Sequence, residues 1–449
     1  MKHYSFLLIA CTLLTVACTD TSVTDYESYR VLVTLQNPLT GTMVPGAEVT
    51  LASSTGNTWQ SETDSTGTAS FRLPTGLYSL SSSAEYTDDA QTKYFFNVSA
   101  GNMLVNAGNC PHGTGRFTFD FTASRCGSLI IKELYNSGCQ KDDGSGSYQF
   151  DKYCTLYNNG QTPLRLTNLA LGISSPYNAQ ANSGSNYTED GHLSYESEGF
   201  IPAIQAIWYY PDTLVLEGNQ SATIALNGAI DHTVSYSQSV DLSRAAYYCT
   251  YDPMVFTNVS HYPVPSTLIP ESHYWKAVFY GAGNAWPVST TSPAFFVWQT
   301  PDSIPVRDYA NNEANVFYSG GDEKPTYACR KIPTDWILDA IEVFTTSSTL
   351  NRKRLTSAVD AGAVYLTQQR GYTLYRCVDV DATLAIEGNA DKLVYGLPQT
   401  PDASTGVVTA DPSGIDAEAS LANGAVIIYK DTNNSTHDFF ERYQSALRD

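Results

Sequence analysis

Short runs of apolar, β-branched and aromatic residues within residues 127–172 constrain the fold of this chain more than any other feature. Gly, Asn, Asp and Pro, which favour tight turns, separate one run from the next. Leu164 and Leu166, then Leu169 and Leu171, recur every second residue, which places both leucines of a pair on one face of a strand. An amphipathic helix would need a spacing of about three to four residues. The stretch therefore predicts β-strands joined by tight turns.

The N-terminal part of the chain, residues 28–123, has a similar order of strands and turns. Apolar runs alternate with Val-Pro-Gly-Ala at 44–47, Asp-Ser-Thr-Gly at 64–67 and Leu-Pro-Thr-Gly at 73–76. Each glycine stands where a tight turn needs a positive φ, and proline confines the chain at a strand edge. This order resembles the carboxypeptidase regulatory-like domain and the B-type repeats of bacterial surface proteins. The resemblance implies a β-sandwich that acts as a spacer or docking domain.

A second resemblance covers residues 127–449. It rests on Ile-Ile-Lys-Glu-Leu-Tyr-Asn-Ser-Gly at 130–138, Leu-Tyr-Asn-Asn-Gly at 156–160, Asp-Trp-Ile-Leu-Asp-Ala-Ile-Glu at 335–342, Tyr-Thr-Leu-Tyr-Arg at 372–376 and Asp-Thr-Asn-Asn-Ser-Thr-His-Asp-Phe at 431–439. In this order the motifs resemble a lamin-tail-type domain. That family implies an immunoglobulin-like β-sandwich used as an interaction or carrier module, usually without catalysis.

These observations predict an all-β chain with two immunoglobulin-like β-sandwich domains in tandem, residues 28–123 and 127–449. The second domain would be enlarged by long insertions. Two of them, at 174–200 and 228–335, are rich in Tyr, Asn, Ser, Gly and Pro, and we expect them to be irregular. A third insertion spans 384–423.

The N-terminus has the features of an exported lipoprotein. Residues 1–17 combine a short basic start with an apolar run that is too short to span a bilayer, and Cys18 follows directly. This arrangement resembles the signal peptide of bacterial lipoproteins, which implies a lipid anchor on Cys18 and a polar tether at 18–27. Acidic residues in the tether resemble the surface-export signal of Bacteroidota-type lipoproteins. We therefore expect an outer-membrane protein exposed at the cell surface, with a periplasmic orientation or a plain secretory signal as the alternatives.

The charge of the chain limits its partners. The formal net charge is −20, while 42% hydrophobic and 16% charged residues are typical of a folded protein. Binding to nucleic acid comes mainly from Lys and Arg side chains that neutralise phosphates. We therefore expect no nucleic-acid partner.

Cysteine usage is compatible with export. Seven cysteines remain after Cys11 and Cys18, so at least one is unpaired. Cys139 and Cys154 flank the first polar loop of the second domain, where a disulfide would close a hairpin. No Cys-x-x-Cys motif occurs, which disfavours thioredoxin-like chemistry and zinc-ribbon sites.

The 228–335 insertion is the predicted binding region because it is dense in aromatic residues. Trp and Tyr stack on flat ligands and anchor protein interfaces. The candidate ligand-binding residues are Tyr251, Tyr274, Trp275, Trp286 and Trp298. The alternative is that these rings cover an oversized sandwich.

No motif predicts catalysis or a cofactor. His-Glu-x-x-His, Gly-x-Ser-x-Gly and Walker-type motifs do not occur. His261 and His273, with Cys249 and Met254 nearby in the sequence, could hold a metal or haem. Histidines in an aromatic loop are more often satisfied by local hydrogen bonds, so we expect no metal and no cofactor.

The function expected from these features is that of a non-catalytic surface lipoprotein. By analogy, such a protein would capture a glycan, peptide or other small ligand, or assist a TonB-dependent transporter of the outer membrane. A structural or adhesive protein that binds other proteins or host matrix is the alternative. An exported hydrolase is a less favoured alternative.

Overall fold

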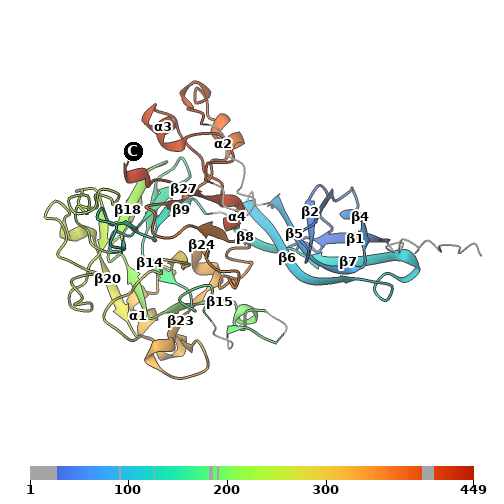
Figure 1. Cartoon of the computed structure of the whole chain (residues 1–449), viewed down its shortest axis with the longest axis horizontal. Coiled ribbons are helices and arrows are strands. Elements are labelled where there is room, and N and C mark those ends of the chain that lie inside the picture. The colour runs from blue at the N-terminus through green and yellow to red at the C-terminus, as the bar shows by residue number, and fades with distance from the viewer. Residues whose placement is uncertain are drawn as a thin grey trace, which may run out of the picture. The chain divides into compact units, whose positions relative to one another are not determined.

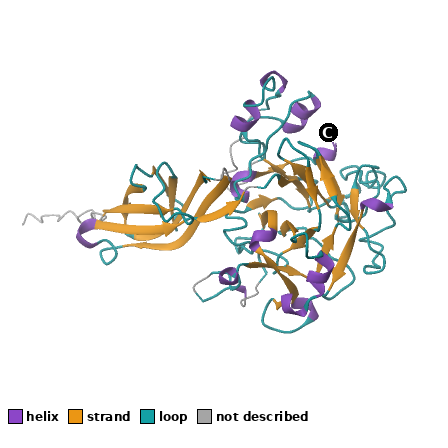
Figure 2. Ribbon diagram, turned by 180° about the vertical axis from the view of Figure 1, so that it is seen from behind, coloured by secondary structure: helices purple, strands orange, loops and turns teal. Residues whose placement is uncertain are grey.

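The computed structural model describes residues 28–89, 93–125, 127–181, 186–189, 192–396 and 409–448. The predicted signal peptide, Cys18 and the tether lie outside these residues. The all-β prediction is confirmed: strands and loops make up almost all of the described chain (Figure 2). Among its helices, α1 (Val306–Asn311) and α3 (Ala417–Ala422) each have 6 residues. No helix in the described chain is long and apolar enough to cross a membrane.

The backbone divides into two compact units. Among the described residues, the first comprises 28–35, 43–80 and 100–119, and the second comprises 36–42, 81–89, 93–99 and those from 120 to 448. Each unit is described by itself below.

The strands of residues 28–125 form two sheets (Figure 1). A three-stranded sheet has the order β4 (Thr68–Pro74), β1 (Ser28–Gln36), β7 (Thr114–Asp120). A five-stranded sheet has the order β3 (Thr58–Glu62), β2 (Glu48–Ser53), β5 (Gly76–Thr87), β6 (Lys93–Val105), β8 (Thr122–Arg125).

The sequence pattern of β4 shows why it forms a strand. Ala69, Phe71 and Leu73 are buried, and the residues between them are exposed, so one face packs inward. The turn before β4 needs glycine. Gly67 has a φ of +71°, and a Cβ there would lie 2.6 Å from the Cβ of Met43.

The centre of the second unit is a twelve-stranded sheet. Its order is β25 (Val364–Leu366), β24 (Ile337–Thr345), β21 (Ala294–Gln299), β14 (Leu169–Ile173), β16 (Ala206–Tyr209), β20 (Tyr274–Phe279), β19 (Tyr248–Thr250), β18 (Ser221–Ala225), β12 (Tyr153–Asn158), β9 (Leu129–Tyr135), β26 (Thr373–Arg376), β27 (Phe439–Arg442). The strands predicted around Leu164 and Leu169 are β13 (Leu164–Leu166), which pairs with β17 (Leu214–Leu216), and β14.

The expectation that residues 228–335 are irregular is wrong in part. This stretch supplies β19, β20 and β21 to the central sheet. It also supplies β22 (Val316–Tyr318) and β23 (Ala328–Pro333), which join β15 (Phe200–Ile204) in a three-stranded sheet. The strands are short, and β21 is buried on both faces, so its sequence shows no alternation of apolar and polar residues.

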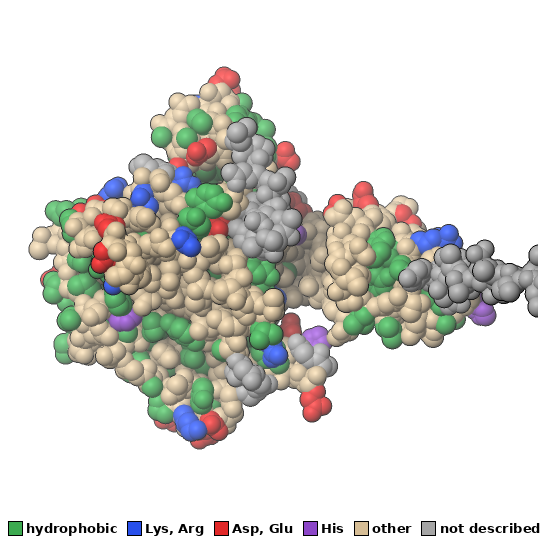
Figure 3. Space-filling model, viewed as in Figure 1, with side chains coloured by type: hydrophobic (Ala, Val, Ile, Leu, Met, Phe, Trp, Pro, Cys, Tyr) green, Lys and Arg blue, Asp and Glu red, His purple; other side chains and the backbone are tan. Residues whose placement is uncertain are grey.

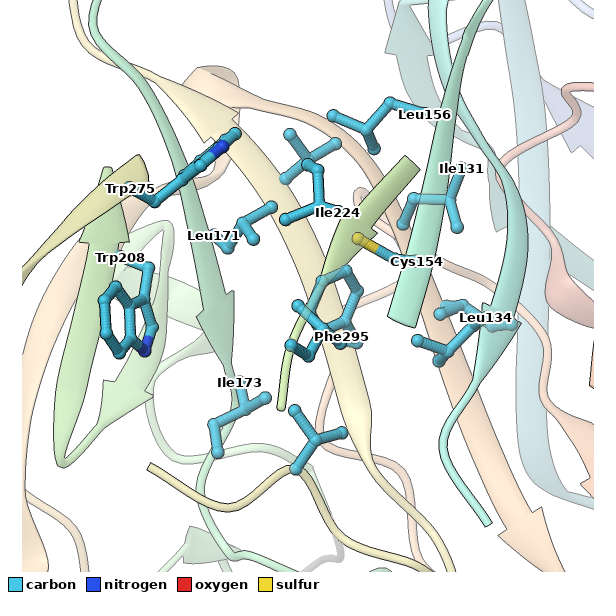
Figure 4. Packing of buried hydrophobic residues seen from close by; sticks show 14 of the residues in the cluster. Ile131, Leu134, Cys154, Leu156, Leu171, Ile173, Trp208, Ile224, Trp275 and Phe295 are labelled. Atoms are coloured by element: carbon cyan, nitrogen blue, oxygen red, sulfur yellow. The ribbon is translucent and has the colours of Figure 1, made fainter. Parts of the chain in front are cut away.

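The largest hydrophobic core lies against the twelve-stranded sheet. Figure 4 shows side chains from β9, β12, β14, β18 and β21 pointing toward one another. They include Ile131, Leu156, Leu171, Ile224 and Phe295, all of which are buried. The core is therefore built from strands that are far apart in the sequence.

A buried cationic side chain joins several of these strands. The guanidinium of Arg376 on β26 forms a salt bridge with Asp339 on β24 and donates a hydrogen bond of 2.8 Å to the carbonyl of Ile131 on β9. It also lies 3.4 Å from Asp431 and 3.7 Å from Asp438. All of these charged side chains are buried. We call this set the Arg376 cluster.

A second buried pair fixes the segment after β24. Arg354 donates hydrogen bonds of 2.9 and 2.6 Å to Oε1 of Glu342, and both side chains are fully buried. Arg354 also donates to the carbonyls of Pro176 and Ser292, at 3.1 and 2.8 Å. The pair therefore holds three distant segments together.

Replacing Arg376 with Met should destabilise the second unit strongly. The change leaves Asp339, Asp431 and Asp438 buried without their cation, and removing one partner of a buried ion pair costs about 3–5 kcal/mol. Urea unfolding followed by circular dichroism measures the loss. The matched control is Lys324→Met, which breaks the exposed pair with Asp322 and should leave the free energy of unfolding nearly unchanged. Equal losses in the two variants would contradict the role of the cluster.

Candidate functional site

The predicted aromatic binding face is wrong because its tryptophans belong to the core. Trp275, Trp286 and Trp298 each have 0% of their surface exposed. Trp275 packs beside Tyr210, with ring centroids 5.6 Å apart, and Trp298 stacks with Trp336 at 6.4 Å. The strands β20 and β21 belong to the central sheet, so their rings fill the interior of the unit. No ligand can stack on these three side chains in this structure.

The two candidate tyrosines lie elsewhere. Tyr251 and Tyr274 are half-buried and meet edge to face, with ring centroids 5.5 Å apart. Both pack against a small core cluster that includes Cys249 and Ile269. The structure brings these tyrosines together but does not join them with the tryptophans into an open face.

The two candidate histidines have separate local partners. His261 meets the ring of Phe150 edge to face at 4.9 Å and lies 3.4 Å from the side-chain nitrogen of Asn227. Nδ1 of His273 lies 3.0 Å from the carbonyl of Tyr247, and the ring stacks on Tyr248. Within the described residues, no group of three or more His, Cys, Asp and Glu side chains is placed to hold a metal ion.

The predicted Cys139–Cys154 disulfide is wrong for this structure. The described cysteines are all buried free thiols, namely Cys110, Cys139, Cys154, Cys249, Cys329 and Cys377, while Cys126 lies outside the described residues. Cys139 on β10 (Cys139–Gln140) is paired with Tyr148 on β11 (Ser147–Tyr148), so backbone hydrogen bonds close the hairpin. Cys154 instead points into the main core. Burial raises the pKa of Cys139 to about 12, which makes its thiol unreactive.

The exposed large hydrophobic side chains of the 228–270 loops are aliphatic rather than aromatic. Those with more than 60% of their surface exposed are Val234, Met254, Val259, Val264 and Leu268. We call them the apolar loop residues. Figure 3 shows hydrophobic side chains over the loops that Figure 1 draws beside β18 and β20. Sequence reasoning missed these residues because isolated aliphatics between Pro, Ser and Asn carry no periodic signal.

A buried aromatic group holds these loops in place. The rings of Phe256 and Tyr262 stack at 5.4 Å, and both lie beside Trp208. The hydroxyl of Tyr262 accepts a hydrogen bond of 3.0 Å from the backbone of Trp286. Backbone bonds between loops add to this, such as that from Ser266 to the carbonyl of Ala229 at 2.8 Å. The loops are therefore fixed from inside, while their aliphatic side chains face solvent.

A buried polar group beneath the same loops could suggest catalysis, but its geometry argues against it. Ser239 donates a hydrogen bond of 2.6 Å to Asp151, not to a histidine. The two nitrogens of His232 are occupied by the hydroxyl of Tyr148 at 2.8 Å and the carbonyl of Gly228 at 2.6 Å. Burial lowers the pKa of His232, which favours the neutral ring. The set lacks the nucleophile-to-base contact that a catalytic triad needs.

Next to Asp151, Lys152 is a buried cation with little compensation. Its Nζ donates a hydrogen bond to the carbonyl of Val288, and the side chain is almost fully buried. Burial lowers the pKa of Lys152 from 10.5 to about 8, although the nearby Asp151 acts in the opposite direction. The desolvation of this amine therefore lowers the stability of the folded protein.

A further group of charged residues surrounds a pocket between α3, β26 and β27. Glu418 at the start of α3 lies 2.7 Å from Nζ of Lys132 on β9 and accepts a hydrogen bond of 2.5 Å from the hydroxyl of Tyr375 on β26. Burial would raise the pKa of Glu418, but the charge and hydrogen bond of Lys132, together with Tyr375 and Arg442, hold it below its usual value. The carboxylate is therefore ionised at neutral pH.

Comparison with known proteins finds a family match for part of the chain. Residues 218–379 match the family described as "Protein of unknown function (DUF4876)". The match includes the apolar loop residues and the Asp339 and Arg376 members of the Arg376 cluster. The family description names no activity. A search of the curated proteins found no match.

Among solved structures, the chain is similar to a DUF4876 family protein from Bacteroides thetaiotaomicron. The two share 19% identity with a TM-score of 0.51, over 92% of this chain and 94% of that one. This likeness shows a shared fold over most of the chain. The Bacillus anthracis TIE protein shares 13% identity over 43% of this chain and 32% of its own, and a putative carbohydrate binding protein from Bacteroides uniformis shares 10% over 42% and 98%. Their TM-scores of 0.16 and 0.15 are too low to support any inference.

Replacing Trp286 with Ala should destabilise the loops rather than weaken the binding of a ligand. Truncating a fully buried Trp costs about 3–5 kcal/mol, and urea unfolding followed by circular dichroism measures it. Met254→Ala, at a side chain 91% exposed, is the control and should change stability by about 0.5 kcal/mol or less. A small loss in Trp286→Ala would show that the ring does not belong to the core.

Replacing Lys152 with Met should raise stability at pH 7, and the advantage should shrink at higher pH. Between pH 8 and 10.5 the unfolded chain binds more protons at Lys152 than the folded protein does, so wild-type stability rises across this window. Urea unfolding of both proteins at several pH values measures the difference. The control is Leu350→Met, at an exposed side chain without a titrating group, and its stability difference should stay constant. A constant difference for Lys152→Met as well would contradict the buried-amine interpretation.

Proposed function

We propose that this protein is a non-catalytic lipoprotein, anchored in the outer membrane through Cys18, whose second unit binds a protein partner through the apolar loop residues. In this proposal the first unit is the spacer that its resemblance to regulatory-like domains implies. The second unit is the lamin-tail-like head that carries the binding surface. The lipoprotein-like signal at residues 1–17, followed directly by Cys18, supports the proposed membrane location.

The exposure of the apolar loop residues is the observation that carries this proposal. Val234, Met254, Val259, Val264 and Leu268 are 79%, 91%, 75%, 74% and 61% exposed. Burying apolar surface contributes about 25 cal/mol per Å², so a partner that covers these side chains gains binding free energy from each of them. Exposed apolar patches mark interaction sites, and these five side chains all belong to the loops of residues 228–270. Because the loops are already fixed, little conformational entropy is lost when they bind.

The local charge favours a protein over a lipid surface. Residues 228–270 contain Asp231, Asp241 and Asp252 but only one cation, Arg244. Loops that insert into bilayers usually pair apolar side chains with Lys and Arg, because membrane surfaces are anionic. An acidic loop region on a chain of charge −20 lacks that attraction. We therefore propose an integral protein of the same membrane, a TonB-dependent transporter, as the partner.

Site-specific crosslinking in cells tests this proposal. A photo-crosslinking residue is placed at Val264 in the full-length protein, and crosslinked partners are identified by mass spectrometry. To test the loop residues, the crosslinker is moved to Met254. The triple variant Val259→Ser, Val264→Ser, Leu268→Ser should then recover at least tenfold less of the partner. The matched control is Leu350→Ser, which removes an aliphatic side chain 72% exposed outside these loops.

The identity of the partner separates the alternatives. A transporter that is lost in the triple variant and retained in Leu350→Ser supports the accessory function. A host-matrix or other surface protein with the same dependence would replace the transporter with the adhesive alternative. Partner recovery that is unchanged in the triple variant would overturn the proposal, because the variant keeps its buried core and should fold.

A further inference from the structure

A polar pocket in the second unit lies between two segments that are distant in the sequence. One wall is the hairpin of β10 and β11, and the other is the loop 367–371 between β25 and β26. Two glycines of the hairpin complete a lining whose side chains come from Gln140, Ser147, Gln368, Gln369 and Arg370. The volume of the pocket is about 340 Å³, within the range of roughly 300–1,000 Å³ that is usual for small-molecule sites. All of the lining residues belong to the described chain.

The loop 367–371 is held in place by its backbone. The amide of Gln369 donates a hydrogen bond to the hydroxyl of Ser137, and the amide of Gly371 donates one of 2.9 Å to the carbonyl of Gly138. Gln369 has a φ of +58°, a left-handed conformation that is unfavourable for a residue with a Cβ. The surrounding structure therefore imposes this backbone, and a ligand would not have to order the loop.

Three polar side chains of the pocket have unused hydrogen-bonding capacity. Within the described residues, the side chains of Gln140, Gln369 and Arg370 form no hydrogen bond or ion pair. The buried Arg354 and Arg376, by contrast, donate to carboxylates and carbonyls of the protein. The pocket thus brings together one guanidinium and two amides that can bind groups from outside the protein.

Arg370 gives this pocket a positive charge on a chain whose net charge is −20. It is the one charged residue of the lining, all of which is described. The two acidic residues at the tip of the hairpin lie outside the lining and have partners of their own. Asp142 accepts a hydrogen bond of 2.8 Å from the hydroxyl of Ser237, and Asp143 accepts one of 2.9 Å from the amide of Ser145. The lining therefore favours an anionic group over an amine.

We infer that this pocket binds a small sugar acid, a ligand with one carboxylate and several hydroxyl groups. A planar carboxylate matches the fork of the Arg370 guanidinium, which can donate to both of its oxygens. The amides of Gln140 and Gln369 each have donors and an acceptor, which suits hydroxyl groups. Because the described lining offers no ring for stacking, the carboxylate contact supplies most of the specificity. The site shares no residue with the apolar loop residues and does not rest on the proposed partner.

The experiment titrates the purified full-length protein with separate small probes, and calorimetry and ligand-observed NMR measure binding. The sugar acids are D-glucuronate and D-galacturonate, and the matched neutral sugars are D-glucose and D-galactose. Propionate supplies a carboxylate without hydroxyl groups. We expect at least one sugar acid to bind. Its neutral counterpart and propionate should bind at least tenfold more weakly, because each lacks one of the two sets of contacts.

Two variants locate the binding. Arg370→Gln removes the guanidinium and should weaken the sugar acid at least tenfold, since hydrogen bonds between charged groups are the strongest that the pocket can form. Gln369→Gly removes an amide but suits the positive φ of that position, so the loop keeps its conformation while the affinity falls at least threefold. The matched control is Arg165→Gln, at an exposed guanidinium on β13 outside the pocket, and it should leave the affinity unchanged. Circular dichroism checks the fold of each variant.

Three outcomes would overturn the inference. These are that no sugar acid binds, that a neutral sugar or propionate binds as tightly as the sugar acids, or that Arg370→Gln and Arg165→Gln have the same affinity. The loop variant Val259→Ser, Val264→Ser, Leu268→Ser should retain full affinity for the sugar acid. Failure at the pocket and failure at the partner surface are therefore distinguished.

Discussion

The buried guanidinium of Arg376 is the interaction on which the second unit most depends. It joins β26 to β24 through Asp339, to β9 through the carbonyl of Ile131, and to the segment before β27 through Asp431 and Asp438. Removing such charges from water costs several kcal/mol each, so the cluster is stable only when all its partners are in place. The amide of Ile131 also donates to Asp339 at 2.5 Å. This brings β9 and β24, which lie far apart in the strand order, directly together.

The 228–335 insertion is part of this framework rather than a set of loops on its surface. Its strands continue the central sheet, and its aromatic rings fill the space between the sheet and the loops. Because bulky rings are the side chains that gain most from burial, they occupy the inside, and the smaller aliphatic side chains stay at the loop surface. The result is a set of fixed loops with exposed Val, Met and Leu side chains, which suits protein contacts better than stacking on a flat ligand.

Several ionisable groups of the second unit serve the fold rather than chemistry. Asp151 accepts hydrogen bonds from Ser239 and Tyr135, and the nitrogens of His232 contact the hydroxyl of Tyr148 and the carbonyl of Gly228. Arg354 and Glu342 form a closed pair. The Glu418 carboxylate and the Lys132 amine likewise compensate one another.

The sequence by itself determined the all-β class and the strands at Leu164–Leu166 and Leu169–Ile173, because turn residues and a period of two are local properties of the chain. Its motifs at 335–342, 372–376 and 431–439 also contain every charged member of the Arg376 cluster. Only the tertiary structure decided which side chains of the insertion face solvent. A Trp on a short strand has the same local pattern whether its ring is covered or open, since burial depends on which distant strand packs over it. For the same reason, no local pattern predicts that the thiols of Cys139 and Cys154 are unpaired, or that Lys132 lies beside Glu418.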